Sequence, residues 1–241
     1  MRTAQLIYQM INTFEPGKVF GYDNLKLQSD QFVAAAKALQ RLKNKGVIKS
    51  ISKGQFFKPV KSVFGELNPS EDEILKLYMM KNNKRVSYIT GVSLFNSMML
   101  TTQIPNIIRI ASYDKRKSCD TGTLKIKTAK SYVKVTDYNY KLLQLLDVLK
   151  DFNKIPDLDR RSAVDIIISR FITLSKKAIK EIVEYSFKYP PRVRAFLGSI
   201  LEYLGDVNEI EKLKESINPF STFKISLNKN ILPTIINWNI K

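Results

Sequence analysis

The chain has 241 residues and a formal net charge of +18, with 40 Lys and Arg against 22 Asp and Glu. It holds no histidine and a single cysteine, Cys119. These counts exclude hydrolases with a histidine base, His-ligated metal sites, internal disulfides, all-cysteine zinc sites and iron–sulfur clusters. We therefore expect no metal and no cofactor.

The rest of the composition, 44% hydrophobic and 26% charged, is typical of a globular protein. The N-terminus lacks the apolar segment of a signal peptide, and the apolar runs are shorter than the ~20 residues that span a bilayer. We therefore expect a soluble, cytoplasmic protein without a membrane partner. Because positive surfaces attract phosphates, the basic surplus favours an anionic partner. A merely basic surface is the alternative.

The charge is unevenly distributed along the chain. Residues 1–60 carry ten Lys and Arg against three acids, a net charge of +7, whereas residues 61–75 have a net charge of −3. The net charge of residues 76–134 is +10. We place a domain boundary after residue 60, which gives domains 1–60 and 61–241. Proline, glycine and asparagine over residues 58–69 favour a short ordered linker there.

The N-terminal domain begins with a predicted helix, strand and second helix. Apolar residues recur at helical spacing through residues 6–11, and Pro16 follows. Residues 19–20 predict a short strand. Asp23 or Asn24 is suited to cap a brief second helix.

A longer helix is predicted between Ser29 and Gly46. Ser29 is a typical N-cap residue, and glycine commonly ends a helix. The apolar residues expected on its buried face are Val33, Ala36, Leu39 and Leu42.

Residues 47–51 and 55–57 then predict a hairpin with its turn at 52–54. Helices followed by such a hairpin are typical of a winged helix-turn-helix. In that architecture the third helix enters the major groove of DNA and the hairpin, or wing, contacts the backbone or the minor groove.

The predicted third helix and wing carry residue types that bind DNA. Gln can form two hydrogen bonds with adenine and Arg two with guanine, whereas Lys and Ser contact phosphates. Double-stranded DNA is therefore the partner we expect; a merely solvated helix face and a protein-binding winged helix are the alternatives. The candidate DNA-binding residues are Ser29, Gln31, Lys37, Arg41, Lys45, Lys49, Ser52, Lys53 and Gln55.

The second domain is predicted to be mixed at first and then helical. Ser70 and Glu73 form a capping-box pattern at the start of a helix that runs to about Met80. Apolar residues at helical spacing extend from Tyr138 to Leu204. The fold class is therefore α+β, an N-terminal winged helix-turn-helix followed by a larger mixed α/β domain with a helical C-terminal half. Strands are expected over 86–90, 101–112, 125–128 and 132–136, with a helix over 91–100.

Several distinctive motifs lie along the chain. They are Leu39-Gln-Arg-Leu42 with Gly46-Val-Ile48 and Lys53-Gly-Gln-Phe56, the segment 91–100 with Thr101-Thr-Gln-Ile-Pro105, the segment 189–198 with Asn218-Pro-Phe220, and Trp238-Asn-Ile240. Through these motifs, over nearly its whole length, the sequence resembles the AbiEi-type antitoxins.

The resemblance implies a component of a bacterial type IV toxin–antitoxin system, associated with abortive phage infection. It implies that the winged helix binds operator DNA and represses its own operon, and that the C-terminal domain counters the toxin. The implied toxin resembles a nucleotidyltransferase and forms no stable complex with the antitoxin. The alternative is an RNA- or protein-binding module of the same fold without repressor or antitoxin activity.

An enzyme is the strongest rival class. Asp157 and Asp159 form an Asp-x-Asp pair of the kind that holds Mg²⁺, but the pair precedes a helical run and is better suited to capping that helix. A second candidate pair at Asp206 lacks its other carboxylate, and no glycine-rich phosphate loop is present. We therefore expect no enzymatic activity and no catalytic residue.

Further basic residues suggest a second surface for nucleic acid, with a solvated hairpin tip as the alternative. Arg192 and Arg194 follow a Tyr-Pro-Pro helix start, and either contact a partner or cap neighbouring carbonyls. The residues of this second basic surface are Lys115, Arg116, Lys117, Lys125, Lys127 and Lys130, with Arg192 and Arg194.

Overall fold

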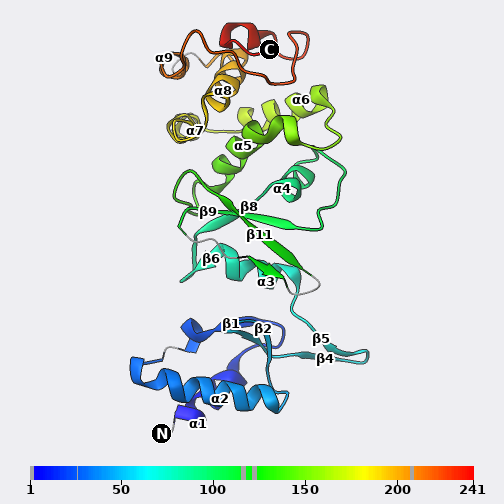
Figure 1. Ribbon diagram of the computed structural model, residues 1–241, viewed down its shortest axis with the longest axis vertical. Coiled ribbons are helices and arrows are strands. Elements are labelled where there is room, and N and C mark those ends of the chain that lie inside the picture. Colours follow the sequence, from blue (N-terminus) through cyan, green and yellow to red (C-terminus); the bar gives the residue numbers. More distant parts are fainter. Residues whose placement is uncertain (1–2, 26, 115–117, 121–123, 207–208) are drawn as a thin grey trace. The chain divides into compact units, whose positions relative to one another are not determined.

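Figure 1 shows the computed structural model, an α+β fold that divides into two compact units. The first unit comprises Met1–Lys81 and Cys119–Leu124, and the second comprises Asn82–Ser118 and Lys125–Lys241. This division reflects packing, and a functional boundary after residue 60 stays a prediction. The structure describes residues 3–25, 27–114, 118–120, 124–206 and 209–241.

The first unit begins with a winged helix-turn-helix, as the sequence predicts. Its three strands form an antiparallel sheet in the order β1-β3-β2. The second helix is a single 3-10 turn that contains Asp23 and Asn24, so neither residue precedes it as the predicted cap. The Asn24 side chain accepts a hydrogen bond from the Gly21 N–H (2.8 Å) instead. The elements are α1 (Thr3–Thr13), β1 (Val19–Gly21), η1 (Tyr22–Leu25), η2 (Ser29–Gln31), α2 (Phe32–Asn44), β2 (Lys49–Ser52) and β3 (Gln55–Phe57).

The buried face of α2 differs from the predicted one. Val33 is 70% exposed, and Ala36 is exposed as well. Residues spaced three apart drift by about 60° per step around a helix, so Val33 and Ala36 lie off the face that Leu39 and Leu42 bury. The residues that α2 packs against the core of the first unit are Ala35, Ala38, Leu39 and Leu42.

The segment 58–69, predicted to be a linker, is a second β-hairpin of the first unit. Its strands are β4 (Val60–Ser62) and β5 (Gly65–Leu67), paired antiparallel. The prediction was wrong because the strands are only three residues long and the turn carries Val63 and Phe64 instead of polar residues. The remaining elements of this unit are α3 (Glu71–Met79), β6 (Met80–Lys81) and β10 (Cys119–Asp120).

Helix α3 begins at Ser70, whose Oγ accepts a hydrogen bond from the Glu73 N–H (3.3 Å). This bond confirms Ser70 as the predicted N-cap. It satisfies one of the free amides of the first helical turn, where acidic side chains also complement the helix dipole.

The second unit begins with a small sheet. Strand β8 pairs antiparallel with β9, and β9 pairs parallel with β11. The elements are β7 (Lys84–Arg85), β8 (Ser87–Thr90), α4 (Val92–Ser97), β9 (Ile108–Ser112) and β11 (Lys125–Lys130).

Two predicted strands of this unit are wrong in whole or in part. Residues 101–107 lie outside any strand, since Pro105 lacks the N–H that a central strand position needs. Residues 132–136 form no strand because side chains take the bonds that a partner strand would make. Asn139 Nδ2 donates to the Lys134 carbonyl (2.9 Å), and Asn139 Oδ1 accepts from the Thr136 N–H (2.8 Å).

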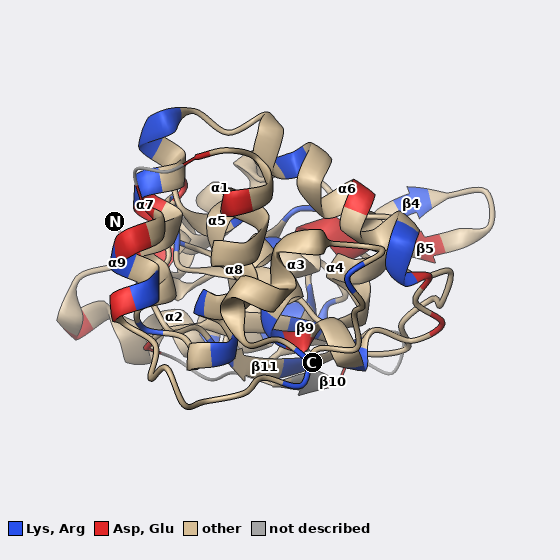
Figure 2. Ribbon diagram, turned by 90° about the horizontal axis from the view of Figure 1, so that it is seen from above, with Lys and Arg blue, Asp and Glu red and all other residues tan. Residues whose placement is uncertain are grey.

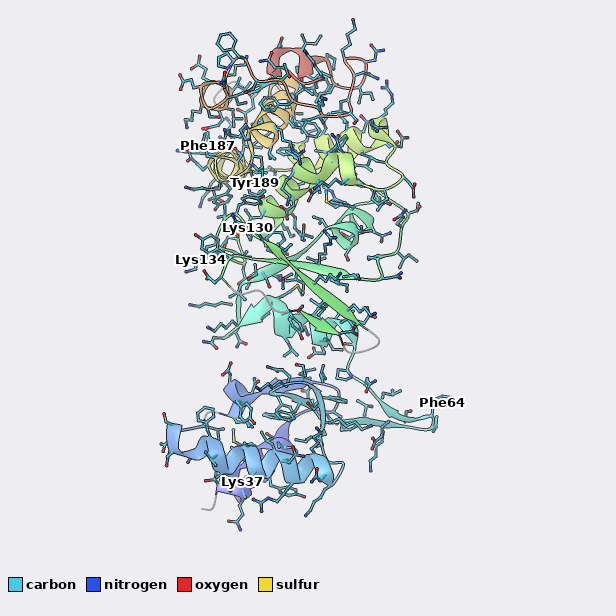
Figure 3. All side chains as sticks on the ribbon, viewed as in Figure 1. Lys37, Phe64, Lys130, Lys134, Phe187 and Tyr189 are labelled. Carbon is cyan, nitrogen blue, oxygen red and sulfur yellow. The ribbon has the colours of Figure 1, made fainter. Side chains whose placement is uncertain are left out.

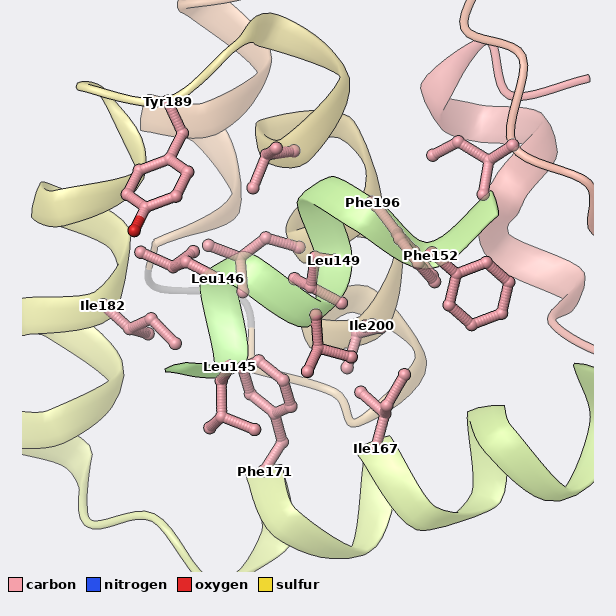
Figure 4. Close-up of a cluster of buried hydrophobic side chains, with 14 of the residues drawn as sticks. Leu145, Leu146, Leu149, Phe152, Ile167, Phe171, Ile182, Tyr189, Phe196 and Ile200 are labelled. Atoms are coloured by element: carbon pink, nitrogen blue, oxygen red, sulfur yellow. The ribbon is translucent and has the colours of Figure 1, made fainter. Parts of the chain in front are cut away.

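The C-terminal half of the second unit is helical, as predicted. Leu146, Phe152, Ile167, Phe196 and other apolar side chains from successive helices meet in one core (Figure 4). No helix within the described residues is both long and apolar enough to cross a membrane. The helices are α5 (Tyr140–Asp151), η3 (Phe152–Lys154), α6 (Arg160–Ile172), α7 (Lys176–Ser186), α8 (Pro191–Tyr203), α9 (Ile210–Glu215) and η4 (Pro233–Trp238).

Candidate nucleic-acid interface

The face of α2 that points away from the core of the first unit is continuous and, apart from Val33 at its start, polar. Val33, Lys37, Gln40 and Asn44 are all exposed and follow one another at steps of four, three and four residues. Such spacing places them on one face of a helix. In Figure 3 the side chain of Lys37 points outward from α2. This row is the natural candidate for insertion into a groove.

Hydrogen bonds along α2 hold part of this face in place. Gln40 Nε2 donates to Asn44 Oδ1 (3.0 Å), so the two amides are oriented as a pair. Arg41, beside the row, donates from Nε to the Lys37 carbonyl (3.3 Å) and remains exposed. Both contacts leave polar atoms available to a ligand.

The predicted residues at the ends of α2 have different environments. Gln31 is half-buried, and its Oε1 accepts a hydrogen bond from the Gln28 N–H (3.2 Å) within a capping box. A contact of Gln31 with a base would therefore require this bond to break. Ser29 is exposed in η2, and Lys45 is exposed just beyond the end of α2.

The wing presents one basic side chain at its tip. Lys53 is exposed in the two-residue turn, where Gly54 adopts a φ of +76° that L-residues rarely adopt. Lys49, at the base of β2, forms an ion pair with Glu66 (2.8 Å). Ser52 is half-buried beside the turn.

Gln55 is the predicted wing residue that is least free to contact a ligand. Its side chain lies against Gly21, where an added Cβ would come within 3.0 Å of the Gln55 amide. Its Oε1 is buried and has no hydrogen-bond partner among the described atoms. Gln55 therefore packs the wing against β1.

The interface is positively charged because, apart from Lys49, the basic groups named above have no described carboxylate partner nearby. No described carboxylate lies within 4.0 Å of the charged groups of Lys37, Arg41 or Lys53. Positive charge without local partners attracts phosphates, with a range set by the Debye length of about 8–10 Å in physiological salt.

The structure adds Val33, Gln40 and Asn44 to the residues that the sequence singled out. They were missed because the apolar stripe of α2 was centred on the wrong residues. The closely spaced pair Ala38 and Leu39, with Leu42, was the signal that could have placed the buried face correctly.

The pattern of a family of unknown function, DUF6088, matches residues 6–182 of the sequence. The chain belongs to the DUF6088 family. No curated protein matches the sequence.

The fold is similar to that of the RV2827C protein from Mycobacterium tuberculosis, whose crystal structure aligns with a TM-score of 0.52. The alignment covers 99% of this DUF6088 chain and 90% of the mycobacterial chain, at 9% sequence identity. At that identity the similarity concerns the fold alone.

The second basic surface of this DUF6088 chain is partly described. Lys125 and Lys127 are exposed on β11, and Lys127 lies opposite Arg109 on β9. Arg109 is a basic neighbour that sequence reasoning missed, since the parallel pairing of β9 and β11 was not predictable. Lys130 Nζ lies 5.1 Å from the centre of the Tyr132 ring. The predicted Lys115, Arg116 and Lys117 lie outside the described residues.

Arg192 and Arg194 bind main-chain carbonyls, which is the capping role considered above. Arg192 donates to the Lys150 carbonyl (2.5 Å). The Arg194 guanidinium donates to the carbonyls of Phe187 (3.5 Å), Tyr189 (3.4 Å) and Ser216 (3.0 Å). Burial lowers the pKa of Arg194 from its ordinary value. Arg192 thus ties the C-terminal end of α5 to α8, and Arg194 ties the segments that follow α7 and α9 to it.

The Asp-x-Asp pair consists of two separate local contacts. Asp159 caps α6, accepting hydrogen bonds from the Arg161 N–H (3.0 Å) and the Ser162 hydroxyl (2.9 Å). Asp157 accepts a hydrogen bond from Gln103 Nε2 (3.0 Å). The predicted capping role of Asp159 is therefore confirmed.

A charged network lies inside the second unit. Asp147 is fully buried and accepts hydrogen bonds from Lys150 (2.7 Å), Thr90 (2.7 Å) and Tyr88 (3.1 Å). Burial raises the pKa of the Asp147 carboxyl, and Lys150 opposes that rise. Burial alone would lower the pKa of Lys150, but Asp147 and Asp151 hold it above its usual value.

Perturbed ionisable groups often mark functional sites, yet most of this network is buried, and the Lys150 side chain is only 16% exposed. Tyr88 is 0% and Thr90 4% exposed. The network joins β8 to α5, so we assign it a structural role.

Proposed function

We propose that this chain is a DNA-binding repressor of its own operon and an AbiEi-like antitoxin. The observation that carries the DNA-binding part is the exposed polar row of α2, with the unpaired charge of Lys53 on the wing beside it. The antitoxin part rests on the resemblance of the sequence to the AbiEi-type antitoxins.

The chemistry of the α2 row suits the major groove. Asn and Gln amides match the N6 and N7 groups of adenine, and Arg and Lys match the acceptors of guanine. The hydrogen bond from Gln40 to Asn44 uses one of the two amide hydrogens of Gln40. The other amide hydrogen and the side-chain oxygen of Gln40 stay available to a base. Val33 is suited to contact the methyl group of thymine.

Binding to the chain's own upstream DNA tests the repressor function. We expect binding that is sequence-selective and weakens with salt. Replacement of Arg41 by Ala should relax base preference at a cost of about 1–3 kcal/mol, and Lys53→Ala should weaken binding to every duplex and reduce the salt slope by about 1. Lys177→Ala, an exposed lysine of the second unit, is the matched control. Binding without salt dependence, or no binding, would contradict the proposal.

Growth of cells that express the toxin tests the antitoxin function. The partner we propose is a nucleotidyltransferase-like toxin encoded beside this chain and countered in the cytoplasm without a stable complex. Co-expression of the full chain should restore growth, while co-purification should recover no complex. Continued growth arrest at equal expression levels would remove the antitoxin part and leave the repressor part standing.

An RNA-binding module remains the second candidate, favoured by the adjacent Arg109 and Lys127 of the second unit. Competition between duplex DNA and structured RNA separates the two candidates. A preference for RNA that is lost in the double variant Arg109→Ala/Lys127→Ala would support the RNA-binding hypothesis over the DNA-binding one.

A further inference from the structure

The turn of the β4–β5 hairpin carries two apolar side chains that are almost fully exposed to solvent. Val63 is 93% and Phe64 94% exposed, and Figure 3 shows Phe64 at the extremity of the hairpin. The other described aromatic residues of the first unit are less exposed, from Phe20 at 3% to Tyr8 at 50%. Exposed apolar groups of this kind commonly mark a contact with a partner.

The tip has a defined conformation. Ser62 Oγ donates to the Gly65 carbonyl (2.8 Å) and accepts from the Phe64 N–H (3.2 Å), so one hydroxyl closes the turn from both sides. Gly65 has a φ of +108°, which favours glycine. These constraints direct Val63 and Phe64 outward together.

The base of the hairpin is attached to the winged helix. The Gly17 N–H donates to the Lys58 carbonyl (2.8 Å), which ties the hairpin to the segment before β1. Lys49 of β2 pairs with Glu66 of β5 (2.8 Å). The hairpin is therefore positioned by the same sheet that positions the wing.

The hairpin lies at the opposite end of α2 from the wing tip. Glu66, in the middle of β5, pairs with Lys49, which starts β2 and is close in sequence to the C-terminal end of α2. The wing tip lies at the other end, since Gly54 is next to Tyr22 and Tyr22 packs against Phe32 at the start of α2. Figure 1 shows the hairpin extending from the side of the first unit where α2 ends. A groove occupied by α2 would thus have one hairpin near each end of the helix.

The charges around the tip favour DNA as the occupant. Glu66, the only acid of the hairpin, has its pKa lowered by the hydrogen bond and charge of Lys49, and it also lies opposite Lys61. Figure 2 shows the basic residue on β4 and the acidic residue on β5. A second copy of this chain would bring its own charge of +18 to the contact, whereas DNA would bring phosphates.

The size of the tip also favours a groove. Two apolar side chains are too few for a stable protein interface, which buries at least about 1,000 Å². Apolar wedges of one or two residues are, however, a common means of entering the minor groove and prising base steps apart.

We propose that the β4–β5 hairpin is a second DNA-contacting arm, which inserts Phe64 and Val63 into the minor groove beside the major groove read by α2. Lys61 contacts phosphate at the edge of that groove. This inference rests on the proposed DNA-binding function. It predicts that the bound duplex is bent at the inserted step.

Duplex DNA of the chain's own upstream region, labelled at both ends, provides the test. Binding is followed by fluorescence anisotropy and bending by energy transfer between the labels. Phe64→Ala should weaken binding by about tenfold and remove most of the change in energy transfer. Phe64→Leu, which keeps an apolar side chain at the tip, should bind and bend DNA as the wild-type chain does. Phe220→Ala is the matched control, since Phe220 is also 94% exposed but belongs to the second unit.

The possible outcomes distinguish failure of the hairpin proposal from failure of the proposed DNA-binding function. If the wild-type chain binds and bends DNA and Phe64→Ala does so equally, the arm is wrong and the repressor proposal stands. If the wild-type chain binds no duplex, both fail. If Phe64→Ala instead converts a dimer to a monomer in sedimentation, the tip is a contact between copies of the chain and the DNA arm is overturned.

Discussion

Helices α2 and α8 each have thirteen residues but use them differently. Helix α2 of the first unit buries four residues, all on one side, and leaves its basic side chains in water. Helix α8 of the second unit buries eight, and its two arginines bind main-chain carbonyls. Arginine is thus an exposed surface residue in α2 and a link between elements of the fold in α8. Substitutions in the second unit should therefore change stability, and those on α2 should change binding.

The largest effect on stability is expected for the buried network of the second unit. Lys150→Met leaves the carboxylate of Asp147 buried without its cation, and breaking a buried pair in this way costs about 3–5 kcal/mol. Chemical denaturation measures the loss. The double variant Asp147→Asn with Lys150→Met should recover most of it, because both charges are then gone. No recovery would mean that the network does not act as a charge pair.

The same variant should acquire a pH dependence. Burial raises the pKa of the Asp147 carboxyl above its ordinary value of 3.8, and Lys150→Met removes the largest influence that opposes the rise, leaving the hydrogen bonds from Thr90 and Tyr88. A carboxyl whose pKa is higher in the folded than in the unfolded state binds its proton more tightly when folded. The free energy of unfolding should therefore be greatest below about pH 4 and fall as pH rises through the raised pKa. A variant that gains stability with rising pH relative to wild type would contradict this assignment.

The packing of α8 predicts the next effect. A Cβ at Gly198 would lie 2.1–2.4 Å from three ring atoms of Trp238, whose indole N–H donates to Glu202 (2.6 Å). The ring is thus not free to move aside, and Gly198→Ala should cost about 3 kcal/mol. Gly46→Ala in the first unit is the comparison: an added Cβ meets nothing within 4 Å, and only the positive φ of +72° costs about 1 kcal/mol. Equal losses of stability in the two variants would mean that the Trp238 ring can move away from α8.

Much of this contrast could be predicted from the sequence. The apolar spacing of Leu142, Leu145, Leu146 and Leu149 placed α5, and Ser70 placed the start of α3, because these signals are local. The winged helix was predictable for the same reason. The parallel pairing of β9 with β11 was not, since register depends on residues far apart in the sequence.

The candidate site was predictable in type but not in detail. Lys37, Arg41 and Lys53 are exposed, as their residue types suggest, whereas Gln31 and Gln55 are engaged in contacts of their own. A sequence pattern does not reveal which polar side chains the fold itself will use. Apolar residues at an exposed turn, such as those of β4–β5, likewise break the usual expectation that turns are polar.

A smaller effect compares one arginine from each helix. Arg194→Met removes hydrogen bonds to three carbonyls and should lower the free energy of unfolding by about 1–2 kcal/mol. Arg41→Met on α2 should change it by less than about 0.5 kcal/mol, because Arg41 is exposed and makes one bond to its own helix. Both are measured by the same denaturation experiment. A larger loss for Arg41→Met would break the contrast between the helices.

The smallest effect on stability, and the one that most sharpens the contrast, is expected at Lys37. Lys37→Ala puts a better helix former at an exposed position of α2, so the midpoint of denaturation should stay within experimental error. If Lys37 neutralises a phosphate, its removal should lower the number of counterions released on DNA binding by about one, which is seen as a shallower dependence of log K on log salt. An unchanged slope with weaker binding to one sequence only would instead mean that Lys37 contacts a base.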